Sequence, residues 1–310
     1  MRLVLVVNTS ASSVTHRTRV VIQRALSAEH DVAIATTNRR GHATRLAQGA
    51  ASDGADVVVV LGGDGTLNEA ANGLAGSATA LAVVPGGSTN VFARTIGAAN
   101  DPLEATAQVI AALGAGSVRR VGLGQANGRY FLFHAGIGFD AAVVAKVEKM
   151  AVLKRYAGPA VFLAATASTL ARRYSTRGPR FDISSGDFSA TQSPFAICLN
   201  TSPYTFLGPR PVRVAPGTTL DGPLSLVAFE DLRLPTLAPM AWAALSHQGA
   251  GPGVSQRAHV IAGVHEVRVG AARPVDYQLD GDHIGYASNI DLRWEPDALD
   301  LVFPLPGNDA

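Results

Sequence analysis

The chain has 310 residues, of which 47% are hydrophobic and 16% are charged, and its formal net charge is +2. This composition excludes a disordered chain, leaves room for two domains, and carries too little positive charge to indicate nucleic-acid binding. A single cysteine, Cys198, excludes an intrachain disulfide and a cysteine-based metal cluster. No apolar run suits a signal peptide or a membrane span, so we expect a cytoplasmic protein.

The first 115 residues alternate between strand-like and helix-like stretches. Apolar runs predict strands, and each is followed by a helical pattern. The strands are expected at 2–8, 31–37, 56–63 and 80–87, and the helices at 14–28, 41–52, 66–74 and 102–113. Runs this continuously apolar are typical of strands buried on both faces of a parallel sheet that helices cover. The pattern predicts an α/β domain over residues 1–120.

The remainder of the chain has a different character. Short alternating runs separated by Gly, Pro and Asp predict antiparallel strands, and "ANGR" marks a turn between two of them. Residues 140–180 have a helical pattern. We therefore expect a second, antiparallel β domain over residues 121–310, with the extreme C-terminus returning to the first domain.

The stretch "VVVVLGGDGTLNEAANGL" places a glycine turn between a buried strand and a helix. Gly62, Gly63 and Gly65 permit unusual backbone angles and close approach of a ligand, and the helix start favours an anion. The alternative is a packing turn, in which Thr66 and Glu69 form a capping box. Asp64 is then surplus, unless a divalent cation beside a phosphate requires it. The sequence therefore predicts a phosphate site with Mg²⁺.

A second turn, "LAVVPGGSTNVFART", repeats this arrangement on the next strand. Pro85 should end the strand, since it cannot continue a central ladder. Ser88, Thr89 and Asn90 are candidate helix caps. Two such turns on neighbouring strands can hold one nucleotide between them.

Five blocks in this order carry a resemblance to a known family. They are "GGDGTLNEAANGL", "PGGSTNVFAR", "FHAGIGFDAAVV", "LNTSPYTFLGPRPVRVAPGTTLDGPLSLV" and "DYQLDGDHIG". Together they resemble the diacylglycerol kinase catalytic-domain family, the lipid kinases that include sphingosine and ceramide kinases. The first block alone is less specific, because NAD kinases and phosphofructokinases share Gly-Gly-Asp-Gly-Thr.

The resemblance implies a fold and a nucleotide site. The first domain would be a parallel-sheet domain similar to those of phosphofructokinase and NAD kinase, and it would bind ATP with Mg²⁺. The second would be an antiparallel β-sandwich that takes the lipid. The family's nucleotide-binding positions correspond here to Asn8, Thr37, Gly62, Gly63, Asp64, Gly65, Thr66, Asn68, Glu69, Gly87, Ser88 and Asn90. Val91 stands where the family usually has an aspartate.

The "LDGD" turn corresponds to the family's catalytic base. The resemblance implies Asp280 as the acceptor of the lipid hydroxyl's proton, with Asp282 beside it, and phosphoryl transfer needs such an acceptor. The alternative for Asp280-Gly281 is a plain hairpin turn. Relatives also carry a structural Mg²⁺, for which Asp221 would supply one carboxylate; Thr218 stands where the other is expected.

Residues 146–180 are a candidate for contact with the membrane that holds a lipid substrate. Eight basic residues and one acid flank an apolar run there, as in a surface that binds anionic lipid. The alternative is a core helix with solvated ends. The sequence thus predicts peripheral contact with the inner membrane face, no nucleic-acid partner, and nothing about the oligomeric state.

Three functions remain open at this point. The first is an ATP-dependent lipid kinase that acts on a diacylglycerol-like lipid or on a sphingoid base or ceramide. The second is an NAD kinase or another soluble kinase, although these lack the pairing of "PGGSTNVFAR" with "LDGDHIG". The third is a non-enzymatic lipid- or nucleotide-binding protein, which the departures at Val91 and Thr218 keep open.

Overall fold

The structure, a computed structural model, describes residues 1–139, 141, 142 and 178–305. Of the segments in which we expected a helix (140–180) and membrane contact (146–180), only residues 141, 142 and 178–180 lie within this range. The described chain forms two compact units. One combines residues 1–123 with the C-terminal stretch that begins at Pro296, and the other comprises residues 124–295. Both ends of the chain therefore contribute to the first unit.

A parallel sheet forms the centre of the first unit. Its strands lie in the order β16-β4-β3-β1-β2, and the end of β16 joins it through the pair Leu301–Leu81. The strands are β1 (Arg2–Asn8), β2 (Asp31–Thr37), β3 (Val57–Gly62), β4 (Ala80–Pro85) and the end of β16 (Asp282–Val302). As expected, β4 ends at Pro85. β3 and β4 are fully buried, whereas β2 is largely exposed, contrary to expectation, because it lies at the sheet edge.

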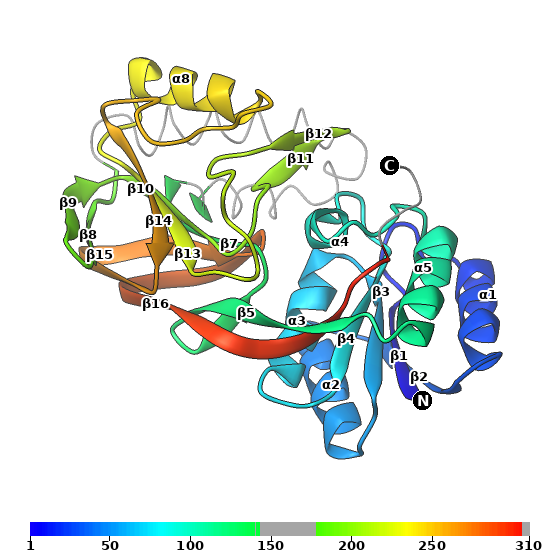
Figure 1. The fold of residues 1–310 in the computed structure, drawn as a ribbon. Helices are drawn as coiled ribbons and strands as arrows, with labels where there is room; N and C mark the ends of the chain where they lie inside the picture. The colour runs from blue at the N-terminus through cyan, green and yellow to red at the C-terminus, as the bar shows by residue number, and fades with distance from the viewer. Residues whose placement is uncertain (140, 143–177, 306–310) are drawn as a thin grey trace. The chain divides into compact units, whose positions relative to one another are not determined.

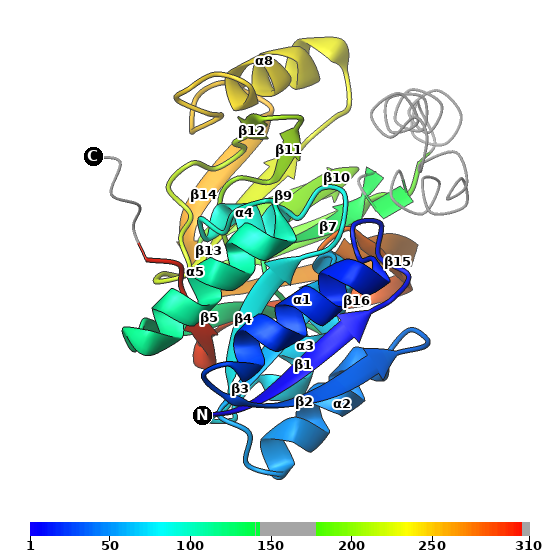
Figure 2. The ribbon, with the colours of Figure 1, turned by 90° about the vertical axis from the view of Figure 1, so that its right-hand side faces the viewer.

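Helices cover both faces of this sheet. Figures 1 and 2 show α1 and α5 on one face and α2 and α3 on the other. The helices are α1 (His16–Ser27), α2 (His42–Ser52), α3 (Asp64–Leu74), α4 (Val91–Thr95) and α5 (Pro102–Gly114). Side chains of α1 and α5 form one apolar cluster with inward residues of β1, β3 and β4. The α/β class predicted for the N-terminal region is confirmed.

The second unit is built on antiparallel strands in the order β14-β13-β10-β7-β15-β16. Its strands are β5 (Val118–Ala126, which begins in the first unit), β6 (Arg129–Phe131), β7 (His134–Gly138), β8 (Phe181–Ser185), β9 (Phe188–Ser193), β10 (Phe195–Leu199), β11 (Thr205–Leu207), β12 (Arg210–Val212), β13 (Leu224–Phe229), β14 (Ala258–Val264), β15 (Glu266–Leu279) and β16. The antiparallel region predicted for the second half is therefore confirmed.

Two features of this unit differ from the sequence-based expectation. The runs near its end form two long strands, β15 and β16, instead of several short ones. Gly270 and Pro274 do not end β15. The register of its pairing with β16 shifts between Gly270 and Val275, and the strand continues beyond the shift. In addition, α8 (Leu234–Ala244) is a helix within the domain for which we expected antiparallel strands, and sequence analysis assigned no element there.

Alternating residues of β10 and β13 belong to two separate apolar clusters. One cluster contains residues of β8, β15 and β16, and the other contains the buried side of α8. The period of two places these clusters on opposite faces of the sheet. Within the described part of the chain, no helix is both long and apolar enough to cross a bilayer.

Candidate functional site

The turn between β3 and α3 differs from the predicted capping box. Helix α3 begins at Asp64, and its N-cap, Gly63, makes no side-chain cap hydrogen bond. The hydroxyl of Thr66 lies inside the helix and accepts a hydrogen bond from Asn8 Nδ2 at 2.8 Å. Because the helix begins two residues earlier than expected, Thr66 cannot act as its cap. The bond between Asn8 and Thr66 therefore ties the end of β1 to the first turn of α3.

Glu69 does not form the capping box either, whereas its place among the nucleotide-binding residues stays a prediction. Its carboxylate accepts hydrogen bonds from the amides of Gly41 (2.7 Å) and Ala43 (3.1 Å), at the start of α2. Gly41, the N-cap of α2, has no side chain that could satisfy these amides. Thr44 Oγ1 donates to the Glu69 carbonyl at 2.9 Å. Glu69 therefore caps the neighbouring helix and ties it to α3.

Asp64 links the first glycine turn to the second. Its Oδ2 accepts from the amide of Val91 at 3.0 Å, and its Oδ1 accepts from the amide of Phe92 at 3.1 Å. These amides start α4, so the carboxylate caps that helix. The inference that Asp64 has no use without a metal ion is therefore wrong. Mg²⁺ bound with a nucleotide at Asp64 stays a prediction.

Asn90 shapes the second turn from within. It adopts φ +48°, and its side chain accepts from the Gly87 amide (2.9 Å) and donates to the Gly87 carbonyl (3.0 Å). It also donates to Asn100 Oδ1 at 3.1 Å, a partner that sequence reasoning missed. Asn90 is the N-cap of α4 but makes no side-chain cap bond, because Asp64 takes that role. The expected capping by its side chain is thus wrong.

The glycines of the two turns approach one another closely. The Gly86 amide donates to the Gly62 carbonyl at 2.8 Å, and a Cβ atom on Gly86 would lie 3.1 Å from Gly62 Cα. A Cβ on Gly87 would lie 3.0 Å from Gly63 Cα. Unusual backbone angles are not the reason for glycine here, contrary to expectation, since Gly63 has φ −90° and its neighbours belong to β3 and α3. Mutual backbone contact explains Gly63, Gly86 and Gly87, whereas a Cβ on Gly62 would meet the Thr66 side chain at 3.0 Å.

The other predicted nucleotide-binding residues of this unit differ from one another in location and exposure. Thr37 pairs with Asn8 at the ends of β2 and β1, so it lies at the carboxyl ends of the parallel strands, as the two turns do. Ser88 is exposed on the second turn. The Asn68 side chain is buried within α3, and its Oδ1 lies 3.3 Å from Asn72 Nδ2. Asn68 and Glu69 are therefore engaged inside the unit.

Helices α3 and α4, which follow the two turns, differ in whether a side chain caps their N-terminus. The Asp64 carboxylate caps α4. Although Asp64 lies in the first turn of α3, its oxygens accept from amides of α4, and α3 itself has no side-chain cap. An uncapped helix start at the carboxyl end of a parallel strand suits an anion. The residues present therefore fit a phosphate group at the start of α3.

Asp280 lies in the hairpin turn between β15 and β16. Asp280 and Gly281 have φ +51° and +80°, and they separate the paired residues Leu279 and Asp282. Two central residues with positive φ are typical of a type I′ hairpin, so the turn expected from Asp-Gly is confirmed. Asp282 begins β16 and is half-buried.

The Asp280 side chain is held by the backbone of residues 132–134, where β7 begins. Its Oδ2 accepts from the Leu132 amide at 2.7 Å, and its Oδ1 accepts from the amides of Phe133 (2.9 Å) and His134 (3.1 Å). Only 5% of Asp280 is exposed. Bonds from amides to a carboxylate are stronger than neutral ones, so these donors fix the direction of both oxygens.

Further buried polar groups surround this carboxylate. Asn200 Nδ2 donates to the Leu132 carbonyl at 3.0 Å. The ring of His134 lies 4.4 Å from that of Tyr204, and burial lowers the pKa of His134 to about 3. Sequence reasoning did not identify His134 or Asn200, although both lie in the quoted blocks "FHAGIG" and "LNTSPY". Their position next to a catalytic candidate is a product of tertiary packing.

The predicted structural metal site at Asp221 receives no support. Asp221 is exposed, and Thr218 Oγ1 donates to the Ala215 carbonyl at 2.9 Å and lies 2.8 Å from Ser225 Oγ. Among the residues that the structure describes, no group of three or more His, Cys, Asp or Glu side chains could hold a metal ion. The Thr218 hydroxyl is thus used in protein contacts at the place of the missing carboxylate.

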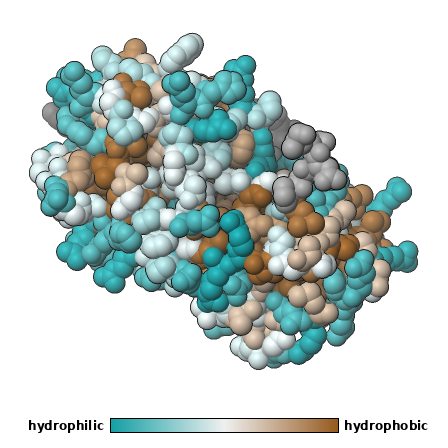
Figure 3. All heavy atoms as spheres, viewed as in Figure 1, coloured by the Kyte–Doolittle hydropathy of each residue, from teal (hydrophilic) through white to brown (hydrophobic). Residues whose placement is uncertain are grey.

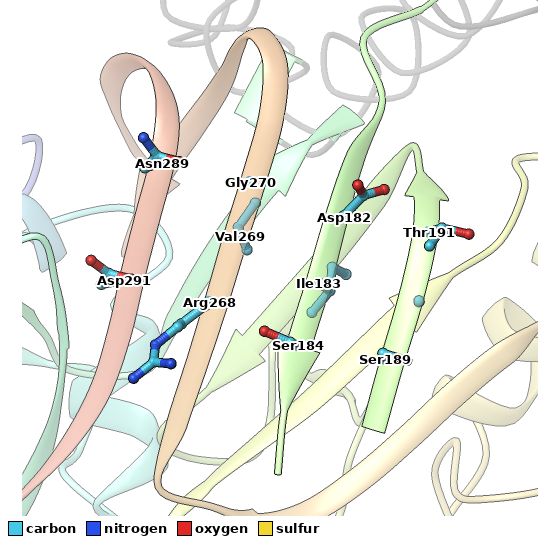
Figure 4. Close-up of a pocket in the computed structure, with 11 residues that line it drawn as sticks. Asp182, Ile183, Ser184, Ser189, Thr191, Arg268, Val269, Gly270, Asn289 and Asp291 are labelled. Carbon is cyan, nitrogen blue, oxygen red and sulfur yellow. The ribbon is translucent and has the colours of Figure 1, made fainter. Parts of the chain in front are cut away.

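An open hollow of about 630 Å³ lies over β8, β9, β15 and β16. Figure 4 shows the residues that line it. Of its two acidic residues, Asp182 and Asp291, the first accepts from the Gln192 amide, and the basic residue Arg268 pairs with Glu266 at 2.9 Å. None of the predicted site residues lines it. We therefore do not assign the candidate chemistry to this hollow.

Comparisons with known proteins give one consistent result. Residues 2–126 match the profile of a family described as diacylglycerol kinase catalytic domain. A "Diacylglycerol kinase" of Bacillus subtilis is 37% identical over 120 residues, which are 38% of this chain and 39% of that protein. A "Probable lipid kinase YegS-like" of Pseudomonas aeruginosa is 33% identical over 269 residues, which are 86% of this chain and 82% of that protein.

The fold matches solved structures as well. A crystal structure of a diacylglycerol kinase from Bacillus anthracis superposes with a TM-score of 0.72 at 20% identity, over 97% of this chain and 96% of that one. At this identity the match concerns the fold alone.

Proposed function

Because the chain belongs to the diacylglycerol kinase catalytic-domain family of lipid kinases, we propose that it transfers the γ-phosphoryl group of ATP to the hydroxyl of a diacylglycerol-like lipid. The product is then a lipid phosphate similar to phosphatidic acid. Mg²⁺ bound with ATP would neutralise phosphate charge. We further propose that the enzyme is cytoplasmic and acts at the inner face of the membrane.

The observation that carries this proposal is the uncapped start of α3. Gly63 offers no side chain there, and Asp64 directs its carboxylate to the neighbouring α4. The first amides of α3 and its dipole thus favour a phosphate group. The contact between the two glycine turns stiffens this cradle, since Gly62 and Gly86 are hydrogen-bonded through their backbones. Asn8, Thr37, Ser88 and Asn90 lie on the strand ends and turns beside it.

Asp280 is the proposed proton acceptor. Three backbone amides hold its carboxylate in one orientation, as an acceptor for a hydroxyl proton must be held. Asp282, the first residue of β16, is proposed to assist it. The same hydrogen bonds also close the hairpin onto residues 132–134, and this structural contribution is measured as stability, separately from turnover.

The direct test supplies the purified protein with labelled ATP and Mg²⁺ and a panel of acceptors. Diacylglycerol in mixed micelles should become labelled fastest. Faster labelling of ceramide or a long-chain base would move the substrate class to sphingolipids. Label in NADP would favour an NAD kinase, and no transfer to any acceptor would favour a binding protein.

The role of Asp280 is tested by Asp280→Asn, with nucleotide binding and folding measured on the same sample. We expect ATP affinity to stay within about threefold of the parent, and turnover to fall by at least about 10². Asp282→Asn is the matched variant on the same hairpin and should lose less turnover. Full turnover in a folded Asp280→Asn protein would remove Asp280 as the base.

A further inference from the structure

Helix α8 is apolar on both of its sides. Met240 and Ala244 lie on the side that packs on the core of the second unit. On the outward side Leu234 is 77% exposed, Trp242 is 81% exposed and Leu245, directly after the helix, is 44% exposed. The helix contains no charged residue. A surface helix normally presents polar residues to water, and an exposed apolar face marks an interaction surface.

The end of α8 is fixed to its neighbours by backbone hydrogen bonds. The amide of Arg213, just after β12, donates to the Ala244 carbonyl at 2.8 Å, and the Ala250 amide donates to the Arg213 carbonyl at 2.8 Å. Figures 1 and 2 show the β11–β12 hairpin beside α8 in both views. In Figure 3, hydrophobic residues reach the surface in the region of α8 among hydrophilic ones. Leu207 on the hairpin is a further exposed leucine, at 48%.

The charges around α8 have one sign over long stretches of chain. No Asp or Glu occurs from Leu232 to His265, or from Thr201 to Leu220. These stretches contain Arg210 and Arg233, both exposed, the second of them directly before α8. The nearest acid in sequence, Asp231, is engaged by the Thr236 hydroxyl at 2.6 Å and by Arg257 at 3.4 Å. An exposed arginine thus stands directly before α8, and a second one begins β12 on the neighbouring hairpin.

We propose that α8 docks on the surface of a lipid bilayer, with Leu234, Trp242 and Leu245 at the boundary between headgroups and acyl chains. Arg210 and Arg233 then face anionic headgroups. The arrangement matches the physics of interfacial helices, in which apolar and tryptophan side chains enter the boundary and basic residues bind anionic lipid. This inference rests on the proposed function, because a lipid acceptor is held in a bilayer that the enzyme must reach.

Vesicle flotation without nucleotide tests the docking separately from the chemistry. The vesicles are phosphatidylcholine alone, or phosphatidylcholine with phosphatidylglycerol. The double variant Leu234→Gln/Trp242→Gln should bind both at least about tenfold more weakly than the parent, since two apolar side chains leave the interface. Arg210→Gln/Arg233→Gln should lose only the advantage of the anionic vesicles. The control is Leu103→Gln, at an exposed leucine (45%) on α5, and it should bind as the parent does.

Tryptophan fluorescence gives a second readout. Trp242 and Trp294 are the two tryptophans, so in a Trp294→Phe protein the emission reports Trp242 alone. Anionic vesicles should shift this emission to shorter wavelength, as the indole leaves water. A parent protein that does not bind vesicles, an unchanged emission, or full binding by the α8 variant would each overturn the proposal.

The oligomeric state and the activity complete the test. A parent that sediments as a dimer and becomes a monomer on Trp242→Gln, without binding vesicles, would assign this face to a second copy of the chain and overturn the docking. If the protein transfers no phosphate but floats in an α8-dependent manner, the proposed function fails and the docking stands. If it phosphorylates lipid in vesicles regardless of α8, the docking alone fails.

Discussion

The two units hold their candidate residues in different ways. In the first unit, two glycine turns touch through their backbones, and the half-buried Asp64 binds the start of a helix. In the second, Asp280 is almost fully buried and binds three successive backbone amides, among further buried polar groups. Asp64 and Asp280 each connect a turn to a segment distant in sequence, but only the hydrogen bonds of Asp280 are buried.

This difference predicts unequal sensitivity to substitution. A half-exposed hydrogen bond can be replaced by water at small cost, whereas a buried donor that loses its acceptor costs the full desolvation of that group. At the glycine turns of the first unit, removing a charge should therefore cost less stability than adding side-chain volume. The second unit should tolerate neither.

The largest expected effect is the loss of stability in Asp280→Asn. Asparagine tolerates the left-handed backbone of this turn. Its NH₂ group, however, must face at least one of the amides that donate to the carboxylate, and two donors cannot form a hydrogen bond. We expect a loss of about 3 kcal/mol in the free energy of unfolding, measured by urea denaturation. Asp282→Asn on the same hairpin should cost less than about 1 kcal/mol. Equal costs for the two would mean that burial does not distinguish this carboxylate.

The next effect concerns volume in the first unit. In Gly86→Ala the new Cβ would lie 2.8 Å from Val14 Cγ2 and 3.1 Å from Gly62 backbone atoms, so the turns must move apart. We expect a loss of about 2 kcal/mol and weaker ATP binding, measured by denaturation and calorimetry. The control is Gly49→Ala, at an exposed position of α2 with nothing within 4 Å of the new Cβ. That variant should gain up to about 1 kcal/mol.

A third effect, of similar size, depends on pH and comes from His134 in the buried cluster. Burial lowers its pKa from 6.5 to about 3, so between these values the unfolded state binds more protons than the folded one. Stability from this group therefore rises with pH across this window and falls on acidification. Between pH 7 and pH 5 the parent should lose about 2 kcal/mol more than His134→Phe, which cannot titrate. Parallel stability curves for the two proteins would show that His134 does not contribute.

The smallest expected effect is that of Asp64→Asn. The side chain keeps one oxygen for an amide of α4 and loses the charge that balances the helix dipole. We expect a loss of about 1 kcal/mol by thermal denaturation. A loss as large as that of Asp280→Asn would contradict the contrast between the two units. A large loss of Mg²⁺-dependent ATP affinity with little loss of stability would instead support a metal contact at Asp64.

Much of the first unit could be predicted because its signals are local. The apolar runs and the helical periodicity located β1 to β4 and the four longer helices to within about two residues at most ends. Pro85 marked the end of β4, and Asp280-Gly281 marked a hairpin. The runs in the second half were harder to interpret. Glycine and proline in β15 suggested breaks, but a register shift accommodates them within one long strand. Helix α8 was missed because its outward side carries no polar residues.

By itself, the sequence determined the fold class, the two glycine turns and the ordered motifs of a lipid kinase family, since each depends on residues close together in the chain. Only the tertiary structure decided which partner each polar side chain takes. Glu69 binds the start of α2 rather than its own helix, and Asp64 binds α4, each across 28 residues or fewer, while Asp280 reaches segment 132–134 across as many as 148. A hydrogen bond needs both atoms within about 3 Å, and for distant residues only the packing of the chain provides that proximity.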